Sequence, residues 1–333
     1  MAALPRIAIC LLAAVAAAWP LAAAAERIAL IVAGAEKHIY LPVTIAARLG
    51  YFRDEQLEVE LESEPSGVSA ADALLAGAAQ GVIGAYDHTI DLQAKGKSMI
   101  AIVQFTISPG EVELVSTRRS GEVRSPADFR GRPVGVTGLG SSTSFLTQYL
   151  ALSHGVKPTE LRLVPVGSGQ NFIDSLRTGR VHAGMTTEPT ASRMIASGEA
   201  KLLVDLRTPE TTQKALGGLY PFACLYVRTD WLASHREQAQ KLANALVRAL
   251  RFISTHSAAE IAAALPDAYF AGDRAGYVQA LAHGKPMFTP DGVMPPHGPA
   301  SVLRVLSAVN RDVQGKAIDL KQTFTSEFVS NVR

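Results

Sequence analysis

Short apolar runs alternate with helix-like segments along the first two-thirds of the chain. The run at 27–34 is mostly apolar and predicts a buried parallel strand. Apolar residues recur at helical spacing over 41–49, and the alternating segment 57–62 predicts a strand with one face in water. Strand–helix–strand order of this kind indicates an open sheet with helices on both faces. The alternation therefore predicts an α/β fold.

A second set of strands and helices begins after residue 121. Ser125 followed by Pro126 is typical of a helix start, with serine as the cap and proline in the first turn. A strand is expected at 134–136 and a helix at 143–154. From residue 231 onward the pattern is chiefly helical.

The two sets share a short repeat. Segments 72–77 and 174–179 both read Asp-x-Leu-x-x-Gly, and each precedes a strand of small residues. A glycine at the end of a helix is favoured there because it accepts a left-handed backbone conformation. The repeat predicts two related, doubly wound lobes.

The N-terminus has the pattern of a secretory signal peptide. Arg6 supplies a positive charge, residues 7–18 are apolar, and three alanines ending at Ala25 suit signal peptidase. We therefore predict that residues 1–25 are a signal peptide cleaved after Ala25 and that the mature chain begins at Glu26. The alternative, a membrane anchor, needs a longer apolar run than this one, which is interrupted at Pro20.

Composition restricts the remaining possibilities. The net charge of the whole chain is +2, which gives no electrostatic basis for binding nucleic acid or an anionic membrane surface. The chain has two cysteines, and Cys10 lies in the predicted signal peptide, so Cys224 has no partner for an internal disulfide. We expect Cys224 to be a buried, inert thiol in a strand.

Motifs of catalysis and cofactor binding are missing from the sequence. No two histidines have the i, i+4 spacing of a helical zinc site, and there is no cysteine cluster. The glycine-rich turn at 137–143 lacks the third glycine of a dinucleotide fingerprint and the lysine of a P-loop. We therefore expect no catalytic residue, no metal and no cofactor.

The same glycine-rich turn is the strongest candidate for binding a solute. It follows a strand and begins a helix, so free backbone N–H groups and hydroxyls are expected to point into one space. In open α/β sheets, ligands bind beyond the carboxyl ends of strands. The alternative is ordinary helix capping by serine or threonine. The candidate residues here are Gly140, Ser141, Ser142 and Thr143.

Other turns that follow strands supply further candidates. For His38 and His88, the alternative to contacting the solute is a surface or capping position. For Tyr86, which could stack on the solute, the alternative is the core. Glu188, which precedes Pro189, also suits a helix start. We expect Glu188 and the 141–143 segment to hold opposite ends of a solute. The candidates at these turns are His38, Tyr40, Ser66, Tyr86, Asp87, His88, Gln170, Asn171 and Glu188.

Several short segments, in the same order along the chain, resemble the NMT1/THI5-like, nitrate–sulfonate–taurine branch of periplasmic binding proteins. The matching segments are 46–52, 57–60, 75–77, 125–131 with 134–136, and 177–189. The resemblance implies a type II periplasmic-binding-protein fold with a ligand cleft between two lobes. It also implies two partners, a membrane permease and its ATPase. The sequence departs from the family pattern at Gln80, His182 and Thr187, so the ligand is not carried over from any member.

These observations lead to one main prediction and two rivals. The chain is expected to be a monomeric periplasmic component of an ABC importer that captures a small organic or anionic solute by lobe closure. The first lobe is predicted at 26–118 plus 222–333 and the second at 119–221, with crossings near 115–118 and 222–226. The rivals are an enzyme that makes a pyrimidine precursor and a ligand sensor built on the same clamp. Sulfonate, other anion, pyrimidine and aromatic acid all remain open as the solute.

Overall fold

A computed structural model describes residues 26–332, and the predicted signal peptide lies outside the described residues. The first of its two sheets has the strand order β2-β1-β3-β10-β4. In this sheet β10 runs antiparallel to β3 and β4, while β1 pairs in parallel with β2 and β3. The strands are β1 (Glu26–Val32), β2 (Leu57–Ser63), β3 (Gly81–Ala85), β4 (Met99–Gln104) and β10 (Ala223–Arg228).

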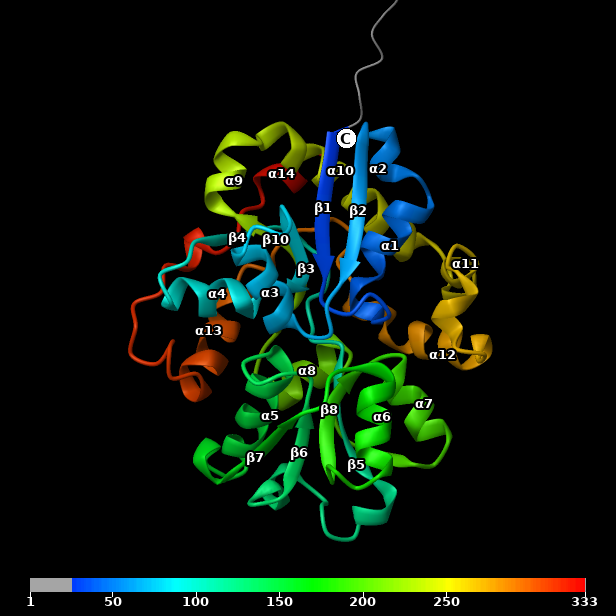
Figure 1. The fold of residues 1–333 in the computed structure, drawn as a ribbon, viewed down its shortest axis with the longest axis vertical. Coiled ribbons are helices and arrows are strands. Elements are labelled where there is room, and N and C mark those ends of the chain that lie inside the picture. Colours follow the sequence, from blue (N-terminus) through cyan, green and yellow to red (C-terminus); the bar gives the residue numbers. More distant parts are fainter. Residues whose placement is uncertain (1–25, 333) are drawn as a thin grey trace, which may run out of the picture.

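The second sheet repeats this arrangement with the order β7-β6-β8-β5-β9. Here β5 is the antiparallel strand, and it lies between β8 and β9 as β10 lies between β3 and β4. The repeated order confirms the two-lobed α/β architecture predicted from the sequence (Figure 1). The strands are β5 (Glu111–Ser116), β6 (Pro133–Val136), β7 (Arg162–Pro165), β8 (Ala183–Thr187) and β9 (Ala200–Leu206).

Helices cover the sheets of both lobes, and those after β10 pack mainly on the first (Figure 1). The helices from the first half of the first lobe are α1 (Leu41–Arg48), α2 (Tyr51–Asp54), α3 (Gly67–Leu75) and α4 (Asp87–Ala94). Those of the second lobe are α5 (Ser142–Ser153), α6 (Gly169–Arg177), α7 (Thr190–Ala196) and α8 (Pro209–Leu216). The C-terminal ones are α9 (Thr229–Ser234), α10 (Arg236–Thr255), α11 (Ala258–Ala263), α12 (Arg274–Gly284), α13 (Gly298–Val309) and α14 (Glu327–Ser330).

The glycines of the repeat end equivalent helices. Gly77 follows α3 with φ 81° and Gly179 follows α6 with φ 78°. Both values lie in the left-handed region, where glycine avoids the steric cost that a Cβ atom would bring. The predicted helix–glycine–strand repeat is therefore confirmed in both lobes.

The chain crosses between the lobes along two adjacent segments. Residues 105–110 lead from β4 to β5, and residues 217–222 lead from α8 to β10. The segments run side by side, since the N–H of Phe222 donates to the carbonyl of Thr106 at 3.0 Å. Paired segments of this kind suit a hinge, because few backbone angles need to change for the lobes to rotate.

Sheet pairing corrects the predicted position of the first crossing. The sequence analysis placed it near 115–118 and extended the first lobe to Arg118, but β5 pairs with β8 and β9 in the second sheet. An apolar run indicates that a strand is buried without indicating which sheet it joins. The second crossing ends where β10 begins, at Ala223, close to the predicted resumption of the first lobe at 222.

The apolar core is continuous between the lobes. Phe145, Leu146 and Leu150 of α5 belong to the same buried cluster as the core of the first lobe. Cys224 is buried in β10, where burial raises the pKa of its thiol well above the usual range, as expected for an inert cysteine.

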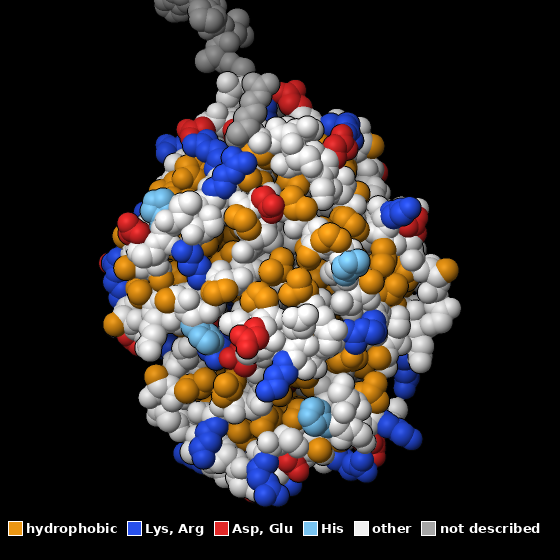
Figure 2. Space-filling model, turned by 180° about the vertical axis from the view of Figure 1, so that it is seen from behind, with side chains coloured by type: hydrophobic (Ala, Val, Ile, Leu, Met, Phe, Trp, Pro, Cys, Tyr) orange, Lys and Arg blue, Asp and Glu red, His pale blue; other side chains and the backbone are white. Residues whose placement is uncertain are grey.

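Surface properties agree with this compact arrangement. On the face shown in Figure 2, apolar side chains gather across the middle of the molecule, and charged side chains of both signs are scattered around them. Within residues 26–332, every helix is too short or too polar to cross a lipid bilayer.

Candidate functional site

A small cavity lies between the lobes, where loops after β1 and β3 meet the turn between β6 and α5. Its volume is about 10 Å³, which is room for a single water molecule. It lies beyond the carboxyl ends of parallel strands in both sheets, as the sequence analysis expected. The cavity is lined by Lys37, Ile39, Tyr40, Gly67, Ala85, Glu111, Thr137, Ser141, Ser142, Thr143 and Phe222.

Most hydroxyls at the start of α5 bond to the turn itself. Ser141 Oγ donates to the carbonyl of Gly138 at 2.6 Å. Thr143 Oγ1 accepts from the N–H of Thr137 at 2.9 Å and also contacts Ser141 Oγ at 2.8 Å. Gly140 has φ 84°, the left-handed conformation that the turn requires. Ser141 and Thr143 therefore cap and brace the turn while they line the cavity.

Ser142 instead reaches across to the first lobe. Its Oγ donates to the carboxylate of Asp87 at 2.8 Å, and the hydroxyl of Tyr220 donates to the other oxygen of that carboxylate at 3.1 Å. All three residues are buried. Burial raises the pKa of Asp87 above its ordinary value. The start of α5, the start of α4 and the second crossing are thus joined behind the cavity wall.

Two charged residues at the cavity were missing from the predicted site. Lys37 and Glu111 are 5% and 3% exposed. The Nζ of Lys37 donates to the carbonyl of Ala33 at 2.6 Å, whereas Oε2 of Glu111 has no hydrogen-bond partner. Burial lowers the pKa of Lys37, and burial together with the nearby Asp87 raises the pKa of Glu111 well above its usual range.

The sequence carried a signal for only one of these two residues. Lys37 belongs to a turn after a strand, which is where candidates were sought. Glu111 begins an apolar strand that was assigned to the first lobe, so nothing in the sequence pointed its side chain toward the cleft.

The two predicted histidines are buried beside the cavity but do not line it. His38 and His88 are 1% and 2% exposed, so their interpretation as surface groups is wrong. Both ring nitrogens of His38 and the Nε2 of His88 lack hydrogen-bond partners. Burial lowers the pKa of His38 to about 3, so its ring is neutral at pH 7. The His38 ring packs edge-on against Tyr277, with 4.3 Å between ring centroids.

Several predicted residues serve the core or a helix start. Tyr86 is fully buried, bonds to Thr323 and packs against Phe324, which favours the core alternative. Ser66 caps α3 by accepting from the N–H of Ser69 at 3.2 Å. Tyr40 lines the cavity.

Gln170 and Asn171 are exposed at the start of α6 and line no part of the cavity. The side-chain amide of Gln170 donates to Asp174 at 2.8 Å within α6. Their role in solute binding remains a prediction.

Glu188 also lies outside the cavity lining, because its carboxylate is held within the second lobe. Arg207 Nη1 lies 2.7 Å from Glu188 Oε1, and the N–H and hydroxyl of Ser192 donate to the same carboxylate at 2.9 and 2.8 Å. The backbone is the part that reaches the first lobe, since the N–H of His38 donates to the carbonyl of Glu188 at 3.1 Å. The structure thus brings Ser142, but not the Glu188 side chain, to the cavity.

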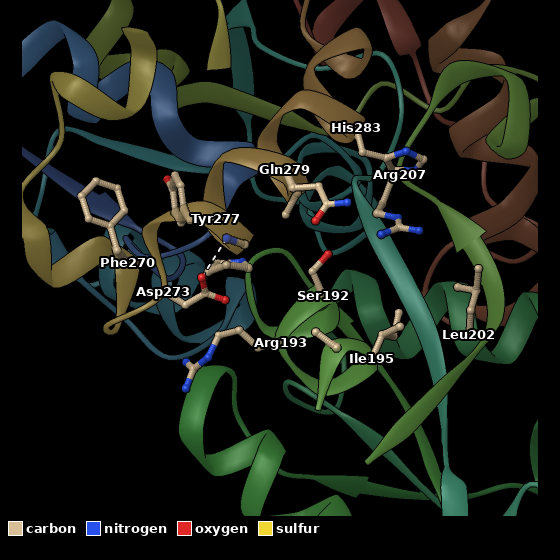
Figure 3. A pocket seen from close by; sticks show the side chains of 14 residues that line it. Ser192, Arg193, Ile195, Leu202, Arg207, Phe270, Asp273, Tyr277, Gln279 and His283 are labelled. Atoms are coloured by element: carbon tan, nitrogen blue, oxygen red, sulfur yellow. Dashed lines mark hydrogen bonds between the residues drawn. The ribbon is translucent and has the colours of Figure 1, made fainter. Parts of the chain in front are cut away.

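A larger hollow lies on the outside of the lobe junction (Figure 3). This outer groove has a volume of about 440 Å³ and runs between α7 and β9 of the second lobe and α12 of the first. Its polar groups include Arg193, Arg207, Gln279 and His283, and Arg207 is already paired with Glu188 and Asp205. The lining of the groove includes Pro189 and Arg207, which follow β8 and β9, but on the first-lobe side it is formed by α12 and the residues just before it. We place the candidate site at the inter-lobe cavity because turns that follow strands of both sheets line it.

Comparison with models of known protein families shows the family to which this chain belongs. The model described as "NMT1/THI5 like" matches residues 38–259, which is more than half of the chain. The chain belongs to the NMT1/THI5-like family. This membership confirms the resemblance found in the sequence. The matched region includes the second lobe, part of the first, and every residue that lines the cavity except Lys37.

Solved structures support the fold of this NMT1/THI5-like protein. A structure from Bordetella bronchiseptica RB50 is 35% identical, covers 92% of this chain and 96% of its own, and superposes with a TM-score of 0.88. The alkanesulfonate-binding protein SsuA from Xanthomonas axonopodis pv. citri, bound to MOPS, is 14% identical over 90% and 98% of the two chains, with a TM-score of 0.72.

A ligand-binding component of an ABC-type import system from Staphylococcus aureus is 12% identical over 92% and 99% of the two chains, with a TM-score of 0.71. The fold is also shared by an enzyme. The desulfurization enzyme DSZB superposes with a TM-score of 0.59, at 15% identity over 92% and 98% of the two chains. Fold alone therefore does not separate binding from catalysis, and the site has to supply that argument.

Proposed function

We propose that this protein is the solute-binding component of an ABC-type importer and holds a small polar solute between its lobes. One observation carries the proposal: Glu111 is buried at the inter-lobe cavity with a carboxylate oxygen that lacks any donor. Leaving a buried polar group unpaired costs about 1–3 kcal/mol, so such groups in native proteins call for a partner. A bound solute is the partner that this position provides for.

Lobe closure gives the binding step its mechanical consequence. The cavity has room for about one water molecule with the lobes as they stand. A larger solute must enter with the lobes apart, through rotation about 105–110 and 217–222. Solute that contacts both lobes then stabilises the closed form by its differential affinity. A permease and its ATPase would recognise that form.

Export and a monomeric state complete the proposal. The signal-peptide pattern at residues 1–25 supports a periplasmic location after cleavage at Ala25. A monomer suffices, because the solute site is built from the two lobes of one chain.

The enzyme alternative is less well supported at this site. Nucleophilic catalysis by a hydroxyl needs a base within hydrogen-bond reach. At the cavity the hydroxyl of Ser142 has the Asp87 carboxylate as its acceptor, and it is not paired with a histidine, because neither ring nitrogen of His38 has a hydrogen-bond partner. We therefore propose that the solute is released chemically unchanged. A ligand sensor built on the same clamp would also release its ligand unchanged. Recovering a chemically altered solute after incubation would favour the enzyme.

The test uses solute recovered from the protein itself. Protein purified without refolding is weighed by native mass spectrometry, and the retained solute is released, identified and titrated back by calorimetry. Ser142→Ala should lower its affinity about tenfold, because it removes a hydroxyl that lines the cavity and whose oxygen can still accept from the solute. Gln279→Ala, in the outer groove, is the matched control and should bind as wild type. The reverse pattern would move the site to the groove.

A further inference from the structure

The structure assigns a chemical class to the solute: we infer that the inter-lobe cavity accepts a protonated amine or amidine rather than a simple anion. This inference rests on the proposed solute-binding function.

The side chains that line the cavity carry one basic and one acidic group, and a second carboxyl group lies directly behind them. Lys37 is the one basic side chain among the described residues that line it, and Glu111 is the acidic one. Asp87 stands directly behind, bonded to the lining hydroxyl of Ser142. The guanidinium of Arg207, in the second lobe, is already paired with Glu188 and Asp205. An added anion would therefore enter a site with two carboxyl groups and one ammonium.

The donors that would bind an anion are largely occupied. The hydroxyl of Ser142 donates to Asp87, and that of Ser141 donates to Gly138. The ammonium of Lys37 gives one of its three N–H donors to the carbonyl of Ala33 at 2.6 Å. Burial also lowers the pKa of Lys37, which weakens it as a permanent positive charge. At the start of α5, backbone N–H groups thus remain available to a ligand, whereas the hydroxyls of Ser141 and Ser142 already donate within the protein.

The acceptor side is the part left open. Oε2 of Glu111 is buried and has no hydrogen-bond partner. Glu111 is the first residue of β5, so it lines the cavity from the second lobe. An ammonium or amidinium group offers two or more N–H donors and a positive charge. Such a group would pair with Glu111 and lower the pKa of its carboxyl, which burial and the nearby Asp87 raise.

The test compares the binding of cationic and anionic probes with similar carbon skeletons, and nitrate is added as a small inorganic anion. The probes are propylammonium, benzamidinium, propanesulfonate, benzenesulfonate and nitrate, each titrated into the full mature chain by calorimetry and thermal shift. We expect saturable binding and a higher melting temperature with the amine or amidine probes. Propanesulfonate, benzenesulfonate and nitrate should leave both readouts at baseline.

A matched pair of variants locates the effect. Glu111→Gln removes the charge at the cavity, and Glu113→Gln makes the same change two residues along β5, where the carboxylate accepts from Thr147 instead of lining the cavity. Glu111→Gln should weaken amine or amidine binding about tenfold or more, and Glu113→Gln should leave it within about twofold. The melting temperature of each ligand-free variant shows that it folds.

The outcomes separate this inference from the proposed function. Binding of an anion probe, with affinity unchanged or improved in Glu111→Gln, would overturn the amine inference while leaving a solute-binding protein. Binding of none of the five probes, together with no solute retained on the purified protein, would overturn both. Amine binding that is equal in both glutamine variants would reject Glu111 as the acceptor and with it the inference.

Discussion

At the residue scale, the carboxyl of Glu113 makes the second lobe sensitive to pH. Glu113 is fully buried in β5, and its carboxylate accepts a single hydrogen bond, from Thr147 at 2.8 Å, while the other oxygen is unpaired. Burial raises its pKa from 4.5 to about 8. The folded protein therefore binds a proton that the unfolded chain releases between these two values. The contribution of Glu113 to the free energy of unfolding should be most favourable below pH 4.5 and should fall as pH rises toward 8.

Glu113→Gln should remove this residue's contribution to the pH dependence, and a neutral amide still accepts from Thr147. We expect the variant to be more stable than wild type at pH 9, by an amount on the order of a few kcal/mol, and nearly equal to it at pH 5. Urea unfolding of the ligand-free protein at both pH values measures the effect. Glu58→Gln, at an exposed ion pair with Arg27, is the control and should follow wild type. Equal stability gains at pH 5 and 9 would contradict the titration argument.

Residue identities at the site were only partly predictable. Tyr40, Ser141, Ser142 and Thr143 were chosen because they follow strands, and that topological rule holds in the structure. Glu188 was chosen by the same rule, yet its side chain turns to Arg207, a residue far enough along the chain that no local pattern links them. Which way a side chain points after a strand depends on partners that sequence spacing does not reveal.

At the element scale, the central strands of the second sheet depend on a close glycine pair. Gly135 of β6 lies beside Gly184 of β8. A Cβ atom on Gly184 would lie 2.7 Å from the carbonyl oxygen of Gly135 and 2.9 Å from the ring of Phe172. Backbone atoms in a paired strand cannot move aside without disturbing the sheet, so the space fits glycine only.

Gly184→Ala should therefore destabilise the protein by about 1–3 kcal/mol, the usual cost of overpacking a core. Thermal unfolding followed by circular dichroism should show a lower melting temperature. Gly121→Ala is the matched control, because a Cβ atom there meets no atom within 4 Å and its φ is not positive. A melting temperature for Gly184→Ala equal to that of Gly121→Ala would show that the strands relax without cost.

Element types were more predictable than their pairing. The apolar and small-residue runs located strands, and the glycines located helix ends, because both patterns arise from local geometry. The sheet to which β5 belongs was not predictable in this way. Its apolar side chains suit either sheet, and the choice is made by pairing with β8 and β9, whose paired residues lie 68 to 95 positions later.

At the scale of the whole molecule, contacts away from the cavity also join the lobes. On the C-terminal side, Arg304 of α13 donates to the hydroxyl of Tyr149 in α5 and to the carbonyl of Leu216 at the end of α8, both at 2.6 Å. On the other side, the hydroxyl of Ser168 donates to Glu36 at 2.8 Å. These bonds favour the closed arrangement independently of any solute, and they oppose the hinge motion about the two crossings.

Arg304→Met should shift the ligand-free protein toward an open form, because it removes two bonds between lobes while keeping an apolar stem against Tyr149. Exposed contacts of this type contribute about 0.2–1 kcal/mol each. The ratio of closed to open molecules should therefore fall a few-fold, and apparent solute affinity should fall with the closed fraction. Small-angle X-ray scattering should report a larger radius of gyration without solute and the wild-type value at saturation. Arg236→Met is the control, since its partner Glu327 lies in the same lobe. A ligand-free radius unchanged by Arg304→Met, with affinity also unchanged, would mean that the packed core around α5, rather than these polar contacts, holds the lobes together.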